Sequence, residues 1–380
     1  MQQQVKVLLT DAAYTHTLGA VRSLGRAGIR VTAVSPNRRA VSFYSRYCHN
    51  KVLCPDPGNE EQFIDFIGNY IQENPVDVLV PVGYLSTVAI SRHRKELLPF
   101  ARIPVADYES MQVACNKQKT MQLAASLDVP VPGEYTSVED ITRFPVVAKD
   151  PYGSGKIRYI GSPREFERLD LTGSLLQEYI PGAGYGFFAL FNHGKVRAYF
   201  MHRRKREFPI TGGASTCAES IYDEDVKKIG LKLLESLRWH GVAMVEFKKD
   251  NRDGMFKLME INPKFWGSLD LSIASGVNFP LLLVNMALNS DIEPVFRYNT
   301  GITFRWPFPE DMVHLCARPA SGMDMLRECF DKRARTNLSL DDPVPNMLQI
   351  PRTCSRLVGL VGSGGLRYPH GRPRVNHNRR

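Results

Sequence analysis

Two carboxylates and one amide are spaced in this chain as ligands for a hard metal ion. Glu246 lies near the end of the run VAMVEF (residues 242–247), and Glu260 and Asn262 lie in LMEINPKFWGS (residues 258–268). Side chains alternate along an extended strand, so Glu260 and Asn262 point to the same side. If the two runs pair as a hairpin, Glu246 joins them and forms the oxygen set that Mg²⁺ prefers, with nucleotide phosphates completing the shell. An edge hairpin with solvated acids explains the spacing equally well.

A lysine before a glycine-containing turn offers a second anion site. Lys149 ends the strand-like run FPVVAK (residues 144–149), and DPYGSGK (residues 150–156) follows. The lysine can neutralise a phosphate while backbone N–H groups of the glycine turn approach the same anion. The segment is not a Walker A loop, because Asp150 and Ile157 replace the glycine and the hydroxyl residue that the loop requires. A simple hairpin turn is the alternative.

Two further segments carry polar groups that suit a nucleotide. QEYIPG (residues 177–182) stops a strand sharply, and main-chain groups at such an end can bind an adenine edge, with Gln177 or Glu178 accepting from its amine. HRRKREFPITGGAST (residues 202–216) has arginines that can hold phosphate or carboxylate oxygens in a bidentate manner. An ordinary strand exit and a solvated basic strand edge are the alternatives.

The elements that must position these residues alternate in type along the first hundred residues. Short apolar strands at residues 5–9, 30–34 and 77–82 are separated by helical stretches, which predicts a parallel sheet covered on both faces. The first strand-to-helix turn, TDAAYTHTLG, lacks G-x-G-x-x-G, so a dinucleotide site is not indicated. Beyond residue 107 two helical stretches are followed by mainly strand-like runs.

The order of these motifs resembles the ATP-grasp superfamily, most closely its carboxylate–amine ligases and carbamoyl-phosphate-synthase-like members. Asn116-Lys117, FPVVAK, QEYIPG, the basic TGGAS segment, VEF and MEINPKFWGS follow one another over residues 110–290. The resemblance implies an α/β and α+β protein with a Rossmann-like pre-ATP-grasp domain over residues 1–106 and an ATP-grasp domain over 107–300. The latter would divide into subdomains at 107–174 and 175–300, followed by a C-terminal element at 301–352 and a basic, disordered tail at 353–380.

The resemblance also implies a role for each matched residue. Nucleotide binding would fall to the first subdomain and the adenine hinge, namely Lys117, Lys149, Gly153, Ser154, Gly155, Gln177, Glu178, Tyr179 and Ile180. Glu246, Glu260 and Asn262 would hold Mg²⁺ or Mn²⁺ on ATP. The transferring phosphoryl group would be neutralised by Lys264, which stands where many family members carry arginine, and by one or more of Arg203, Arg204 and Arg206. The stretch 183–186 has no acid for the ribose hydroxyls.

The implied reaction activates a carboxylate as an acyl phosphate, which an amine then attacks to give an amide, ADP and phosphate. The glycine turn at 150–156 is the expected lid over the acyl phosphate. A carboxyphosphate or carbamoyl-type enzyme and a non-catalytic nucleotide-binding interaction protein remain alternatives. The sequence does not identify the acid or the amine, and His16, His193 and His202 are candidate acid–base groups.

Composition and charge restrict the expected partners and cellular location of the protein. The chain has 380 residues and a net charge of +10, of which seven arginines after residue 342 contribute +7 and the remaining residues +3. Nucleic acid is therefore not expected as a partner, the basic tail apart. The chain carries no apolar run of about 20 residues, and its seven scattered cysteines read as reduced thiols. We expect a cytoplasmic enzyme that acts on small molecules, with a homodimer as the candidate assembly.

Overall fold

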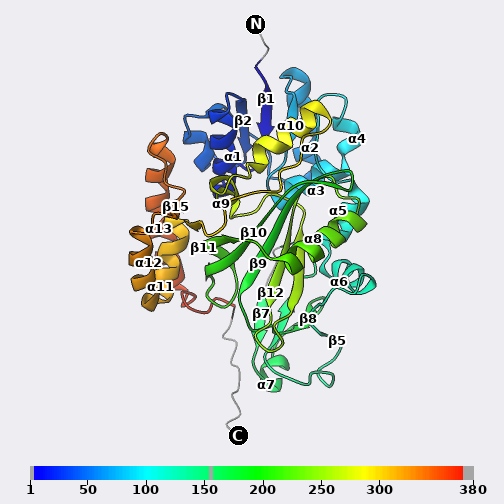
Figure 1. Ribbon diagram of the computed structural model, residues 1–380, viewed down its shortest axis with the longest axis vertical. Helices are drawn as coiled ribbons and strands as arrows, with labels where there is room; N and C mark the ends of the chain where they lie inside the picture. The colour runs from blue at the N-terminus through cyan, green and yellow to red at the C-terminus, as the bar shows by residue number, and fades with distance from the viewer. Residues whose placement is uncertain (1–3, 154–156, 371–380) are drawn as a thin grey trace.

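A parallel four-stranded sheet forms the N-terminal unit, at the top of Figure 1 in blue and cyan. The computed structural model describes residues 4–153 and 157–370. In spatial order the strands are β3 (Cys48–Leu53), β2 (Arg30–Ser35), β1 (Lys6–Leu9) and β4 (Val78–Val80). The helices of this unit are α1 (Thr15–Arg26), η1 (Val41–Tyr44), α2 (Glu60–Glu73), α3 (Tyr84–Arg92) and α4 (Arg94–Leu97). The parallel sheet predicted from the alternation of short strands and helices is confirmed.

A seven-stranded sheet forms the centre of the molecule (Figure 1). In spatial order its strands are β13 (Phe256–Asn262), β12 (Gly241–Lys249), β9 (Gly184–Asn192), β10 (Lys195–Phe208), β11 (Ala214–Ile221), β14 (Thr303–Arg305) and β15 (Ala334–Thr336). The helices around it are α5 (Tyr108–Cys115), α6 (Lys117–Ser126), α8 (Glu224–Ser236), α9 (Leu269–Ala274) and α10 (Phe279–Asn289). The predicted hairpin of residues 242–262 is present, as β12 paired antiparallel with β13.

Alternating residues of this sheet separate two cores. On β9, Phe187 and Ala189 pack with apolar residues of α5, α6 and α8. Phe188 and Leu190 point to the other face, where they join a core shared with the N-terminal unit, α9 and α10. Glu246 lies two residues after Met244, which belongs to this second face. The carboxylate is therefore directed away from the helices that cover the first face.

A small antiparallel sheet lies below the central sheet in Figure 1. Its strands are β5 (Glu134–Tyr135), β8 (Leu175–Glu178), β6 (Val146–Lys149) and β7 (Ile157–Ile160), with the short helix α7 (Pro163–Phe166) after β7. We expected a subdomain boundary after residue 174. That position is wrong by one strand, because β8 pairs with both β5 and β6 and so completes the small sheet.

The C-terminal element is built into the central sheet and does not follow it as a separate unit. Its helices are η2 (Pro307–Asp311), α11 (Met312–Ala317), η3 (Pro319–Ser321), α12 (Gly322–Cys329) and α13 (Pro343–Gly362). β14 pairs with β11, so the predicted boundary after residue 300 cuts through a sheet. The start of the disordered tail at residue 353 is also wrong, because α13 continues to Gly362. Among the described residues, none of the helices combines the length and apolarity of a membrane span.

Candidate active site

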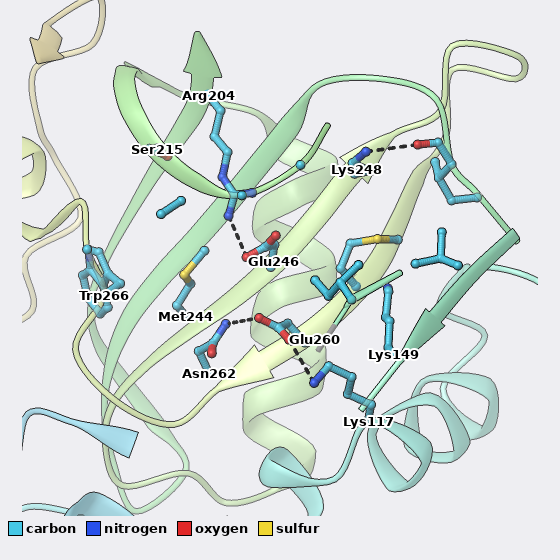
Figure 2. A pocket seen from close by; sticks show the side chains of 18 of the residues that line it. Lys117, Lys149, Arg204, Ser215, Met244, Glu246, Lys248, Glu260, Asn262 and Trp266 are labelled. Atoms are coloured by element: carbon cyan, nitrogen blue, oxygen red, sulfur yellow. Dashed lines mark hydrogen bonds and ion pairs between the residues drawn. The ribbon is translucent and has the colours of Figure 1, made fainter. Parts of the chain in front are cut away.

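The structure brings Glu246, Glu260 and Asn262 together. Glu246 on β12 lies directly opposite Glu260 on β13 in the antiparallel register. Asn262 follows two residues after Glu260 and donates its amide N–H to Glu260 Oε1 at 2.8 Å. Figure 2 shows the three side chains converging on one space. Strand alternation and hairpin pairing therefore bring the three side chains together, as the sequence predicted.

These three residues line a cavity of about 330 Å³ between the central and the small sheet. Eight other residues predicted for the site line the same cavity: Lys117, Lys149, Gly153, Glu178, Tyr179, Ile180, Arg204 and Lys264. They come from both sheets and from the start of α6. The cavity is thus formed where segments far apart in the chain meet.

Cationic side chains surround the acidic pair. The Arg204 guanidinium Nη2 lies 2.6 Å from Glu246 Oε2, and Lys117 Nζ lies 3.6 Å from Glu260 Oε2. Lys149 Nζ donates to the side-chain oxygen of Gln177 at 3.1 Å. Lys117 also donates to the carbonyl of Gly153, which ties the glycine turn to α6. Glu246 and Glu260 therefore share the cavity with Lys117, Lys149 and Arg204.

Burial disfavours the charged forms of the ionisable side chains in this cluster and shifts their pKa values. It lowers the pKa of Lys149 to about 8, with the nearby Lys117 ammonium acting in the same direction and the Glu260 carboxylate opposing both. Burial also lowers the pKa of Lys264. It raises the pKa of Glu246, although Arg204 opposes the shift. A bound polyanion would stabilise the buried ammonium groups.

The opposite end of the cavity carries the predicted adenine hinge. Lys248 Nζ donates to the carbonyl of Ile180 at 3.2 Å and lies 5.3 Å from the centre of the Tyr179 ring. The Glu178 carboxylate lies 2.5 Å from Arg252. Lys248 was not expected at the site, although its position two residues after Glu246 on one strand indicates that it faces the same cavity.

Three predicted site residues do not line the cavity. Gln177 is buried, and its side chain is already used by Lys149 and Glu134. Arg203 pairs with Glu219 on the other face of β10, at 2.8 Å. Arg206 lies on that other face too and binds Asp311 and Glu328 at 2.9 and 2.6 Å. Ser154 and Gly155, also predicted for the site, lie outside the described residues.

A β-bulge between Arg204 and Arg206 explains why Arg206 does not line the cavity. The partner of Arg204 on β11 is Ala218, whereas that of Arg206 is the adjacent residue Cys217, so Lys205 is an additional residue in the strand. A bulge reverses the alternation of faces beyond it. Arg204 therefore lines the cavity, and Arg206 points to the other face.

The donor set fits a divalent ion bound together with phosphate. Two carboxylates and an amide oxygen are hard ligands, and Mg²⁺ is held by one or two carboxylates plus substrate phosphates. Among residues 4–153 and 157–370, no group of three or more His, Cys, Asp or Glu side chains is placed to hold a metal by itself. Oxygen ligands from a nucleotide would therefore have to complete the shell.

The chain is similar to a family model and to several known proteins. A family model described as "ATP-grasp in the biosynthetic pathway with Ter operon" matches residues 170–307. The D-aspartate ligase of Enterococcus faecium (strain Aus0004) is 23% identical over 302 residues, which cover 68% of this chain and 71% of that protein. Residues 170–307 therefore match an ATP-grasp family model, and the chain resembles the ATP-grasp superfamily.

Solved structures share the fold of this chain at low sequence identity. The N5-carboxyaminoimidazole synthetase of Staphylococcus aureus complexed with ADP has a TM-score of 0.63 and 13% identity, covering 85% of this chain and 86% of that chain. The L-amino acid ligase of Bacillus licheniformis has a TM-score of 0.60 and 17% identity, covering 80% and 79%. The resemblance inferred from the order of the motifs is therefore confirmed.

Proposed function

We propose that this ATP-grasp protein joins a small carboxylic acid to an amine, with ATP converted to ADP and phosphate. The observation that carries the proposal is the cross-strand pair Glu246 and Glu260 with Asn262, set among Lys117, Lys149 and Arg204 in one cavity. This combination suits a triphosphate with its divalent ion. D-aspartate ligase and L-amino acid ligase, among the proteins to which the chain is similar, carry names of the same reaction class.

In the proposed reaction, an oxygen of the substrate carboxylate attacks the γ-phosphorus of ATP, and the bond to the β-phosphate oxygen breaks. ADP leaves, and the product is an acyl phosphate. The amine then attacks the acyl carbon, phosphate leaves, the amine loses a proton and an amide results. Phosphoryl transfer depends mainly on positioning and charge neutralisation.

The side chains of the protein supply those two requirements. Mg²⁺ held by Glu246, Glu260 and Asn262 would neutralise charge on the phosphates. Lys117 and Lys149 face the same space and would bind phosphate oxygens. Arg204 would exchange part of its contact with Glu246 for the transferring phosphoryl group. The adenosine part of ATP would bind at the other end of the cavity, against Tyr179, Ile180 and Lys248.

A screen of ADP release with Mg²⁺, over pairs of small acids and amines, tests the proposal. Glu260→Gln should reduce ADP release by about 10²–10³-fold, because it removes a charge that the phosphate-bound ion requires. Glu219→Gln is the matched control, since Glu219 lies on the other face of the same sheet with Arg203. If Glu260→Gln turned over like the wild type, the metal assignment would be wrong. If neither ATP binding nor acid-dependent ADP release were found, the function would be wrong.

A further inference from the structure

Two buried ring side chains at one end of the cavity lack hydrogen-bond partners. His202 is 1% exposed and Trp266 is 2% exposed, and both line the cavity. Among the described residues, neither nitrogen of His202 nor Nε1 of Trp266 has a partner. Buried polar atoms are nearly always paired. Two such side chains lining one cavity indicate a ligand with matching polar groups.

Packing holds the two rings in place. The Phe188 ring lies edge-on to His202 at 4.7 Å between centroids and 4.5 Å from Trp266. Gly186 makes this possible, because a Cβ there would lie 2.5 Å from Phe188 and 3.2 Å from His202 Nε2. The rings are therefore fixed before a ligand arrives, which lowers the entropic cost of binding it.

The rings lie on the opposite side of the acidic pair from the adenine hinge. His202, Gly186, Glu246 and Glu260 form one row across four adjacent strands. Figure 2 shows Trp266 and Lys248 at opposite ends of the cavity, with Glu246 between them. A nucleotide with its base near Lys248 and its phosphates over the acidic pair would point its terminal phosphate towards the rings. This is the end at which the substrate that receives the phosphoryl group must bind.

The charges at this end disfavour a substrate cation. Glu246 and Glu260, the acids of this row, are already paired, with Arg204 and Lys117 respectively. The Nε of Arg204, which is also buried, has no partner among the described residues. Burial, with Arg204 nearby, lowers the pKa of His202 well below its usual value, so the ring is neutral. A neutral imidazole offers one donor and one acceptor, and the indole one donor.

We propose that His202 and Trp266 bind the acid substrate and select an acid whose carbon next to the activated carboxylate carries an uncharged hydrogen-bonding group. A hydroxyl or an acylated amine fits, and an ammonium does not. The inference rests on the proposed function, because it concerns the acid that receives the phosphoryl group. It adds the substrate class and the residues that recognise it.

Matched acids test the selection directly. Isothermal titration calorimetry would compare each α-hydroxy acid and N-acetylamino acid with the α-amino acid of the same side chain. The protein would be saturated with Mg²⁺ and a non-hydrolysable ATP analogue. We expect the uncharged member of a pair to bind at least about 10-fold more tightly, the difference that one well-placed hydrogen bond can produce. Equal or tighter binding of the amino acid, or no binding by any member, would overturn the proposal.

Variants of the two rings test the assignment. Trp266→Phe keeps an aromatic ring and removes the N–H, so it should weaken acid binding about 5- to 10-fold and leave ATP binding unchanged. His202→Phe should act in the same way, while His202→Gln, which keeps a donor and an acceptor, should retain most of the affinity. Trp239→Phe is the matched control, because that buried indole donates to the Val242 carbonyl outside the cavity.

The outcomes separate this inference from the proposed function. If an acid binds with the expected preference but never stimulates ADP release, the function fails and the binding site stands. If ADP release is acid-dependent but Trp266→Phe and His202→Phe bind the acid like the wild type, the site fails and the function stands. Equal losses of acid and ATP binding in these variants would also overturn the assignment.

Discussion

Two buried arginines of one strand, Arg204 and Arg206, have the same kind of partners and different surroundings. Arg206 holds Asp311 and Glu328 through four hydrogen bonds of 2.6 to 2.9 Å. Arg204 holds Glu246 at 2.6 Å, but its next carboxylate, Glu207, lies 3.6 Å away. Among the described residues, Arg204 Nε and Glu207 Oε2 have no hydrogen-bond partner.

The surroundings of Arg206 are those of a structural ion-pair network, and the surroundings of Arg204 are those of a binding site. Thr216 and Arg305 complete the bonds of Asp311, so the Arg206 network is closed and holds the C-terminal element on the sheet. Arg204 lines the cavity, and among the described residues its Nε has no hydrogen-bond partner. A buried charge that is left unsatisfied costs free energy, so its persistence points to a ligand.

The largest expected effect tests the closed network. Arg206→Met leaves Asp311 and Glu328 buried without their main cation, which should lower the free energy of unfolding by about 3–5 kcal/mol. Urea unfolding followed by circular dichroism measures the loss. Acid-dependent ADP release per folded molecule should remain unchanged. A stable Arg206→Met protein without turnover would contradict this distinction, because the Arg206 network would then act in catalysis.

Arg204→Met should show the reverse pattern. Turnover should fall by about 10²–10³-fold, since a preorganised donor at the transferring group is lost. The loss of stability should be smaller than that of Arg206→Met, because burial already raises the pKa of Glu246 and this acid can take up a proton. Single-turnover ADP formation and urea unfolding of both variants would be compared. Similar stability losses in the two proteins would contradict the distinction.

The pH dependence of ATP binding gives the next effect. Lys149 is an ammonium below its pKa of about 8 and neutral above it. ATP binds the charged form, so its Kd should rise as pH increases above 8, approaching 10-fold per pH unit for a single proton. Calorimetric titration with Mg·ATP between pH 7 and 10 measures the rise. Lys149→Arg, which stays charged, should flatten the profile, and an identical profile in that variant would exclude Lys149 as the titrating group.

The smallest effect is expected for Arg203, which the sequence could not separate from its neighbours. Its side chain is 47% exposed and pairs with Glu219 across the strand. Exposed ion pairs contribute at most about 1 kcal/mol. Arg203→Ala should therefore keep turnover and nearly all stability in the same two assays. A loss of turnover like that of Arg204→Met would show that both faces of β10 serve the site.

The local sequence pattern was sufficient to predict the position of a side chain where strand alternation alone decides it. Alternation in a hairpin predicted the convergence of Glu246, Glu260 and Asn262, and the order of motifs predicted that Lys117 and Lys149 join them. The bulge at Lys205 could not be seen, because it depends on the pairing of β10 with β11. Without it, Arg204 and Arg206 would share a face.

Other features required contacts that no single segment reveals. Gln177 was expected at the adenine, but the nearby Lys149 already uses its side-chain oxygen. β14 has three residues, Thr303–Arg305, too few for a pattern to show that it extends the central sheet. The stretch 183–186 was considered for its lack of an acid. Its two glycines instead leave room, since a Cβ at Gly184 would lie 2.8 Å from Arg204 and one at Gly186 3.2 Å from His202.

The row from His202 through Gly186 to Glu246 has a consequence for the size of the substrate. Neighbouring strands lie about 4.8 Å apart, so two strand spacings separate His202 from Glu246 by about 10 Å. An acid that touches the ring at one end and meets a phosphate above Glu246 at the other must fit within this span. The spacing of the strands thus limits the acid, and moving its uncharged group several carbon atoms away from the carboxylate would put that group beyond the His202 ring.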